Sequence, residues 1–298
     1  MEVTINNCTK ESLQKVLSLV DNEFIFNKKR AVSMATRYPT LFQKSNWENI
    51  YVACFGEDLL ATTTVRNFAL LSNGRMWKGA MIGLVCTAPD ARGRGLASLV
   101  MKAIVQEHKN LDMDFFVLWT NINGFYERLG WVTEDEGAFG KVNLGSLCCN
   151  VKMCIPLTYA DVNIGWIEKM RAKYLQYCVL RSADDYAIIP PSVDVVDFFT
   201  YEGAGAEGYA IVGRKERKGI IYEMVGSPEA FPVLFHSIGQ HVDSLFINDR
   251  PASASGVWLT EKRCVKWQPQ NQAMWYKLSR DFVEVSCKKL YIPYFDRI

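Results

Sequence analysis

The spacing of apolar and polar residues along the first part of the chain predicts helices followed by an antiparallel meander. Apolar positions recur at helical spacing in Lys10–Val20, and Lys29–Thr36 is expected as a second helix that ends before Pro39. Three apolar or alternating runs follow, separated by short glycine-containing turns. Such runs predict paired β-strands. They cover residues 50–55, 59–68 and 77–86.

The pattern then changes from strand to helix. Apolar residues at helical spacing predict a helix over Leu96–His108, and Asp114–Trp119 is short and apolar, as a buried strand is. A short helix is expected around Tyr126, and residues 131–154 read as strands with glycine-containing turns. This order of elements predicts an α/β fold built on a mixed sheet.

The second half repeats the order in a weaker form. Helices are expected at Trp166–Leu180 and Pro228–Val242. We therefore predict two domains, residues 1–154 and 157–298, of which the second is either a degenerate copy of the first or an unrelated α+β domain. The expected strands of the second half are Val195–Tyr201, Gly208–Arg214, Gly219–Val225 and Ser244–Ile247.

The composition is that of an ordinary globular protein. The chain has 298 residues, 49% hydrophobic and 22% charged, which is enough apolar material for two cores. The net charge of +2 and the lack of a long basic tract argue against nucleic-acid binding, and residues 28–30 are interpreted as a solvated helix start. No segment has the pattern of a bilayer span or a signal peptide, so a cytoplasmic protein without membrane contact is expected.

The nine cysteines are expected to be reduced thiols, because structural disulfides are rare in the cytosol. Cys148, Cys149 and Cys154 form a cluster, but neither a histidine nor a pair at zinc-ligand spacing accompanies it. The three histidines are scattered along the chain. We therefore expect no metal site.

The turn after the strand at 77–86 has the chemistry of an anion-binding site. Gly93 and Gly95 allow the backbone to bring N–H groups close together, and the following helix directs its positive end at the same point. Arg92 and Arg94 add positive charge. The spacing matches neither a dinucleotide-binding loop nor a P-loop.

The pattern Arg92-x-x-Gly95-x-Ala97 resembles the pyrophosphate-binding motif of the GNAT superfamily of acetyl-CoA-dependent N-acetyltransferases. A second resemblance lies in residues 121–131, where asparagine is followed by Phe-Tyr-x-x-x-Gly and an aromatic residue, as in the second cofactor motif of that superfamily. The elements between the two motifs also follow the order of the superfamily's cofactor-binding half. The resemblance implies a GNAT fold for the first domain.

The resemblance also implies acetyl-CoA as a cosubstrate, without a metal, and indicates which residues hold it. The end of the strand would offer backbone groups to the pantetheine amides, and the loop would hold the pyrophosphate. Asn121 would hold the cofactor through its amide or, alternatively, cap the short helix. The implied cofactor-binding residues are Val85, Cys86, Thr87, Arg92, Gly93, Arg94, Gly95, Leu96, Ala97 and Asn121.

Tyr126 occupies the position from which the superfamily's tyrosine reaches the coenzyme sulfur. The resemblance therefore implies that Tyr126 is catalytic and donates a proton to the leaving thiolate. The alternative is a core tyrosine whose hydroxyl is merely hydrogen-bonded. Cys86 has no base beside it in the sequence, and we interpret it as a buried strand thiol rather than an acetyl carrier.

The tandem layout resembles the enhanced-intracellular-survival acetyltransferases. In that family an active first copy precedes a decayed second copy and a third domain of sterol-carrier type, whose terminal carboxylate acts as the base. No third domain is expected in 298 residues. Residues 223–229 lack the Arg-x-x-Gly-x-Ala pattern, so the second half is not expected to bind coenzyme A.

The resemblance implies acetyl transfer from acetyl-CoA to a primary amine of a small molecule or peptide, by direct attack in a ternary complex. An alternative is a non-catalytic acyl-CoA sensor or scaffold. A third class, a redox-responsive protein, would use Cys264, which follows Lys262 and Arg263. Homo-oligomerisation is left open by the sequence.

The general base and the acceptor are not assigned by the sequence. The strand at 77–86 contains no acidic residue, and Asp21, Glu23 and Glu48 are remote candidates. Residues 134–136 either attract a cationic amine or simply face water. Aromatic residues of the first helices form either a wall of the acceptor cleft or part of the core; they are Phe24, Phe26, Tyr38, Phe42 and Trp47.

Overall fold

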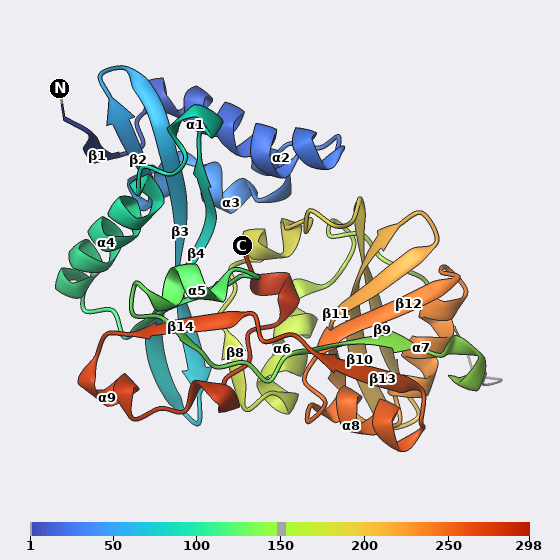
Figure 1. The fold of residues 1–298 in the computed structure, drawn as a ribbon. Helices are drawn as coiled ribbons and strands as arrows, with labels where there is room; N and C mark the ends of the chain where they lie inside the picture. Colours follow the sequence, from blue (N-terminus) through green and yellow to red (C-terminus); the bar gives the residue numbers. More distant parts are fainter. Residues whose placement is uncertain (1, 148–152) are drawn as a thin grey trace.

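The computed structural model describes residues 2–147 and 153–298, whose strands form two mixed sheets. The first sheet has eight strands in the order β1-β2-β3-β4-β5-β14-β6, with β8 paired to β3. The second has six strands in the order β13-β7-β12-β11-β10-β9. In Figure 1 the first sheet lies to the left, and the second, with its orange strands, lies to the right.

The strands and helices of the described residues have the following bounds. The strands are β1 (Thr4–Asn7), β2 (Ile50–Phe55), β3 (Asp58–Ser72), β4 (Arg75–Thr87), β5 (Phe115–Trp119), β6 (Val132–Thr133), β7 (Ala138–Val142), β8 (Tyr177–Val179), β9 (Val195–Gly203), β10 (Ala206–Lys215), β11 (Lys218–Gly226), β12 (Ser244–Asp249), β13 (Val265–Pro269) and β14 (Ala273–Lys277). The α-helices are α1 (Lys10–Phe24), α2 (Met34–Arg37), α3 (Pro39–Phe42), α4 (Leu96–His108), α5 (Asn123–Glu127), α6 (Ile164–Tyr174), α7 (Phe231–Gly239), α8 (Ala254–Glu261) and α9 (Arg280–Val283).

The predicted meander and the helix after it are confirmed. β2, β3 and β4 pair antiparallel in sequence order, and Asn73 and Gly74 make the second turn with positive φ angles. Thr9 starts α1 with a capping box to Ser12. α4 spans Leu96–His108, as predicted, and packs its apolar face on the first sheet.

Two predicted helices are wrong in their bounds. The helix expected at 29–36 is replaced by α2, because Lys29 takes a left-handed φ of 54° and Ser33 caps a new helix start. The helix expected at 166–180 ends at Tyr174, and the chain continues as β8, which pairs with β3. A pairing partner far away in the sequence therefore overrides the local helical pattern.

The two halves exchange strands. β14, near the end of the chain, inserts between β5 and β6 of the first sheet, where its red ribbon is seen below α5 in Figure 1. Conversely, β7 lies between β12 and β13 of the second sheet. The order of an antiparallel pair, a helix and a parallel strand occurs in both halves, as β3-β4-α4-β5 and β10-β11-α7-β12.

The core between the sheets is shared by both halves. One apolar cluster joins α1, α2 and α3 to α6, β10 and β11, and it includes Val16, Tyr38, Ile167 and Tyr209. The end of the second half also contacts the first sheet, because buried Arg66 of β3 donates to the backbone oxygen of Asp296 at 2.8 Å. Within the described ranges, every helix is too short or too polar to cross a bilayer.

Candidate active site

A cleft opens where β4 and β5 separate. The two strands pair in parallel from Gly79 and Phe115 as far as Met81 and Val117, after which each continues without the other. A cavity of about 410 Å³ fills the gap. Its walls come from α1, α2, β4, β5, α5 and the second half, as Phe24, Met34, Tyr38, Ile82, Gly83, Leu84, Val85, Leu118, Trp119, Thr120, Ile122, Tyr126, Pro191, Gln272, Tyr294, Arg297 and Ile298.

The backbone of β4 is distorted at the cleft. Thr62 lies opposite Cys86 and Thr64 lies opposite Gly83, so the register shifts across Leu84 and Val85. Leu84 takes a φ of 50°, a conformation that is strained for a leucine. A bulge of this kind turns backbone groups out of the strand ladder, and Leu84 and Val85 both line the cavity.

The glycine loop between β4 and α4 has the form that an anion requires. Gly93 and Gly95 have φ angles of 77° and 74°, and no atom lies within 4 Å of a Cβ placed on either residue. The backbone N–H groups of residues 93–95 meet no acceptor among the described residues, and no side chain caps α4. The loop therefore presents free donors at the positive end of a helix.

The two arginines beside this loop contact other parts of the first half. Arg92 forms an ion pair with Glu23 of α1 at 2.8 Å and donates to the backbone oxygen of Thr87. Arg94 donates to the backbone oxygen of Asp90 at 3.0 Å. The side chain of Arg92 is 53% exposed, so it tethers the loop to α1 and still faces solvent.

Tyr126 lies in α5 and lines the cleft, with only 6% of its surface exposed. Its hydroxyl makes no hydrogen bond within residues 2–147 and 153–298, and it is not one of the fully buried oxygens without a partner, so it reaches the open space of the cleft. Burial raises the pKa of Tyr126 to about 12. The phenol is therefore protonated at neutral pH and able to donate.

Cys86 is a buried thiol, as expected. Its exposed fraction is 6%, and burial raises its pKa to about 12, so little thiolate forms at neutral pH. We predict that Cys86→Ala retains turnover within about threefold of the native protein, since small buried thiols act mainly through packing. Initial rates of thiol release from acetyl-CoA would measure this, and a loss comparable to that of a catalytic residue would contradict it.

The other described cysteines that the sequence singled out give no sign of a reactive thiol or a metal site. Cys264 is 1% exposed, and burial raises its pKa, which removes the basis of the redox interpretation. Cys148 and Cys149 lie outside the described residues. Among the described residues no three histidine, cysteine or acidic side chains gather as metal ligands.

Asn121 does not cap α5, so that alternative is wrong. The residue before α5 is Ile122, and no side-chain hydrogen bond caps the helix. The side-chain oxygen of Asn121 instead accepts from the amide of Gln272 at 2.6 Å. Gln272 precedes β14 and lines the cleft, whereas Asn121 itself is exposed and is not among the lining residues.

The second half contributes a wall of the cleft that the sequence reasoning missed. The backbone of Ile298 lies so close to β4 that a Cβ on Gly83 would be 2.8 Å from its carbonyl carbon. The guanidinium carbon of Arg297 lies 4.8 Å from the ring centre of Trp119. The density of aromatic residues and the Asp-Arg pair in residues 291–297 is a signal that could have marked this segment as buried.

The aromatic residues proposed for the acceptor side divide into two groups. Phe24 and Tyr38 line the cleft. Phe42 is 7% exposed and belongs to the core, while Phe26 is 58% exposed. Trp47 packs against the same core and donates its indole N–H to Phe42.

The acidic residues considered from the sequence are engaged elsewhere. Glu134 pairs with Lys277 at 3.3 Å, and Asp135 accepts from the backbone N–H groups of Gly137 and Gln272. Asp21 accepts from the backbone N–H of Met34. No carboxylate side chain is among the described residues that line the cleft.

A cleft between separated strands, a loop with free N–H groups and a buried phenol thus lie together in the first half. Known proteins similar to the chain show what such a site does. Residues 4–133 match the family profile described as Acetyltransferase (GNAT) domain. These residues are a GNAT acetyltransferase domain. Proteins with this domain transfer acyl groups from acyl-CoA, and the chain is accordingly an acyltransferase.

Solved structures similar to the chain extend over both halves. A probable N-acyltransferase from Enterococcus faecalis V583 is 19% identical, with 96% of this chain and 75% of that one covered and a TM-score of 0.76. Eis1 from Mycobacterium abscessus is 11% identical, with coverages of 93% and 74% and a TM-score of 0.64.

N-myristoyltransferase from Saccharomyces cerevisiae with bound myristoyl-CoA is 10% identical, with coverages of 92% and 79% and a TM-score of 0.55. At these identities the similarity establishes the tandem GNAT-like fold alone. No curated protein matches the chain in sequence.

Proposed function

We propose that the chain is an N-acetyltransferase that transfers the acetyl group of acetyl-CoA to a primary amine of a small molecule or peptide in a ternary complex. The observation that carries the proposal is the Tyr126 hydroxyl, which lines the β4–β5 cleft and has no hydrogen-bond partner among the described residues. A phenol that lines an open cavity without a protein partner is free to hydrogen-bond a ligand.

The binding of acetyl-CoA would use the two features built on β4. The free N–H groups of residues 93–95 and the N-terminus of α4 would receive the pyrophosphate, with Arg92 and Arg94 adding charge. Backbone groups of the distorted strand end would face the pantetheine amides. The residues proposed to contact the cosubstrate are Val85, Cys86, Thr87, Arg92, Gly93, Arg94, Gly95, Leu96, Ala97 and Asn121.

The proposed reaction is a direct displacement. The neutral amine forms a C–N bond with the thioester carbonyl carbon, the C–S bond breaks, and the departing thiolate takes a proton from Tyr126. A backbone N–H near Val85 would stabilise the negative charge on the carbonyl oxygen. Since no carboxylate side chain lines the described cleft, the proton of the amine would leave through water, and water would return a proton to the Tyr126 phenolate.

The first test is the thermal stability of the purified protein with and without acetyl-CoA. A ligand at a hundred times its Kd adds about 2.7 kcal/mol to the free energy of unfolding, so Tm is expected to rise by several degrees. The double variant Arg92→Glu/Gly95→Asp should lose the shift, because it places negative charge in the loop. Aspartate is strained at the positive φ of Gly95, and Arg92→Glu loses the ion pair with Glu23, so the effect of acetyl-CoA on the variant is measured from the variant's own Tm without ligand.

Three outcomes separate the proposal from its alternatives. No shift in the native protein would contradict acetyl-CoA binding altogether. A shift without thiol release in the presence of a broad panel of amines would favour the non-catalytic acyl-CoA sensor. A shift with turnover would support the acetyltransferase and allow the amine to be identified by competition.

A further inference from the structure

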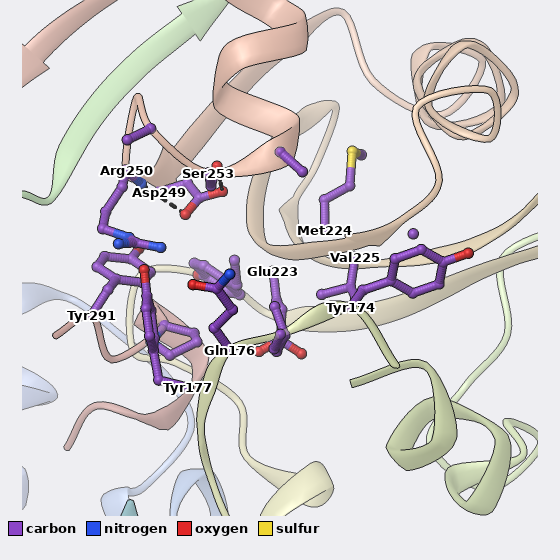
Figure 2. A pocket seen from close by; sticks show the side chains of 16 residues that line it. Tyr174, Gln176, Tyr177, Glu223, Met224, Val225, Asp249, Arg250, Ser253 and Tyr291 are labelled. Atoms are coloured by element: carbon purple, nitrogen blue, oxygen red, sulfur yellow. Dashed lines mark hydrogen bonds between the residues drawn. The ribbon is translucent and has the colours of Figure 1, made fainter. Parts of the chain in front are cut away.

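A second cavity lies where β11 and β12 separate in the second half. These strands pair in parallel from Lys218 and Ser244 to Ile221 and Ile247, after which β11 continues to Gly226 without β12 but still paired with β10. A cavity of about 300 Å³ occupies the gap and is shown in Figure 2. It has the same place in its sheet as the acetyl-CoA cleft has in the first sheet, at the point where a parallel pair opens.

The second cavity lacks the donors that would receive a pyrophosphate. The N–H of Ser227 donates to the backbone oxygen of Glu207, and the N–H of Ala230 donates to that of Ser227. Pro228 has no N–H, and a proline also occupies the first turn of α7. The backbone donors after β11 are thus largely used or absent, in contrast to those of residues 93–95.

One cation of this cavity has no acidic partner. The guanidinium carbon of Arg250 lies 4.5 Å from the ring centre of Tyr177 and 5.5 Å from that of Tyr291, and Figure 2 shows the side chain beside both rings. No ion pair involves Arg250 among the described residues, and its buried Nε atom has no hydrogen-bond partner. Burial lowers the pKa of this guanidinium, while the more distant Glu136 opposes the effect.

One anion of the cavity also has no charged partner. The carboxylate of Asp249 accepts from the hydroxyls of Ser253 and Ser255, at 2.6 and 2.8 Å, and from the backbone N–H of Arg250 at 2.7 Å. Burial raises its pKa, and no cation lies within ion-pair distance among the described residues. A carboxylate can accept about four hydrogen bonds, so one position is left for a ligand.

The other carboxylate that lines the cavity behaves differently. Glu223 is held by Arg181 at 2.6 Å and by the hydroxyl of Tyr209 at 2.5 Å. Its charge is therefore neutralised within the protein. The uncompensated groups that face the cavity are one cation, Arg250, and one anion, Asp249.

We propose that this second cavity binds a free amino acid, with its carboxylate on Arg250 and its ammonium group toward Asp249. A ligand with a carboxylate alone would pair with Arg250 but would leave Asp249 without a cationic partner. A zwitterion supplies a partner to both groups. The remaining wall includes Leu175, Met224 and Val225, so the site favours an apolar or aromatic side chain.

The size of the cavity agrees with a small ligand rather than with a peptide. About 300 Å³ lies at the lower end of the range of small-molecule pockets. The rings of Tyr177 and Tyr291 pack against the guanidinium of Arg250. Because the side chain is already held in place, less conformational entropy is lost when it binds a carboxylate. This inference does not depend on acetyl-CoA binding in the first half.

Calorimetric titration of the full chain with phenylalanine, leucine and methionine tests the proposal. At least one amino acid is expected to bind saturably at a single site. The matched compounds 3-phenylpropionate and phenethylamine each lack one of the two charges, and they are expected to bind at least about tenfold more weakly than phenylalanine, since each loses a charge-assisted hydrogen bond.

Variants of residues that line the second cavity test whether the amino acid binds there. Arg250→Met keeps the aliphatic contact with the two rings and removes the charge, and it should abolish binding. Ala254→Trp blocks the cavity at an exposed wall residue, so it should abolish binding without lowering Tm. Arg217→Met, in an exposed ion pair with Asp243, and Gly95→Asp, in the acetyl-CoA loop, should leave it unchanged.

Three outcomes would overturn the proposal. They are the failure of all three amino acids to bind at millimolar concentration, equal affinity for phenylalanine and 3-phenylpropionate, and binding that survives both Arg250→Met and Ala254→Trp. The last outcome would place the amino acid elsewhere, for example in the β4–β5 cleft as an acceptor. Because the two variants are expected to abolish binding by different means, a folding defect in one of them does not decide the result.

Discussion

Replacing Tyr126 with phenylalanine is expected to lower kcat by about 10²- to 10⁴-fold, the usual contribution of a positioned general acid. The substitution removes one oxygen that has no hydrogen-bond partner among the described residues, and the ring contacts with Phe125 and Trp131 remain. Neither Tm nor the shift in Tm caused by acetyl-CoA should change. Steady-state thiol release and thermal melting measure the two effects separately.

Tyr276→Phe is the matched control for this variant. Tyr276 lies on β14 and packs against Trp131, with ring centres 5.7 Å apart, but it does not line the cleft. It should retain the native kcat. If both variants lose activity equally, or if Tyr126→Phe costs less than about threefold, Tyr126 is not the proton donor.

The pH dependence provides a second readout of Tyr126. Because burial raises its pKa to about 12, the phenol stays protonated through the neutral and mildly alkaline range. The value of kcat/KM should therefore rise as the amine loses its proton and should show no falling limb below about pH 10. A falling limb near neutral pH would indicate a different acid.

The parts of the fold that could be predicted from the sequence are those fixed by local chemistry. Gly93 and Gly95 need positive φ angles, and α4 begins directly after them, so the loop and the helix follow from adjacent residues. The antiparallel meander follows from short turns such as Asn73–Gly74. Family resemblance then places Tyr126 beside the loop, which local pattern alone does not do.

The exchanged strands could not be predicted in this way. β14 has a short apolar pattern that suits any sheet, and its partner β5 lies more than a hundred residues away, as the pair Ala273 and Trp119 shows. β7 is also short, and it pairs with two strands of the second half. Pairings at this distance depend on tertiary packing rather than on periodicity.

The same long-range contacts explain which site residues the sequence reasoning missed. Gln272 reaches Asn121 only because β14 crosses into the first sheet, and Arg297 reaches Trp119 only because the segment after Leu290 enters the space between the sheets. Neither residue belongs to a motif. The sequence of the first half therefore predicts the cosubstrate side of the cleft but not the wall that faces it.

The segment that supplies this wall is held by a buried arginine. Arg181 follows β8 and has a fully buried side chain. It donates to both carboxylate oxygens of Asp296 at 2.7 Å and to both of Glu223 at 2.9 and 2.6 Å. The carboxylates themselves are 1% and 4% exposed. One guanidinium thus joins the first sheet, through β8, to β11 and to the segment that ends at the cleft.

Replacing Arg181 with methionine is expected to lower the free energy of unfolding by about 3–5 kcal/mol, because it leaves two buried carboxylates without their shared partner. Arg171 lies 3.7 Å from Glu223, but Asp296 would keep only more distant cations. Denaturant unfolding measures the loss. Arg217→Met, which breaks an exposed ion pair with Asp243, is the control and should change stability little.

The pH dependence of this loss distinguishes broken charge pairing from a simple packing defect. In the native protein Arg181 holds the pKa of Asp296 below its ordinary value, so the stabilisation from this carboxylate is present at neutral pH and declines as the pH falls toward that pKa. In Arg181→Met the pKa of Asp296 should rise, because only more distant cations then oppose the effect of burial on this carboxyl group. The variant should therefore regain part of its deficit between about pH 8 and pH 5, as the carboxyl group of Asp296 takes up a proton. A deficit that does not change over this range would mean that lost packing, rather than unpaired charge, causes the instability.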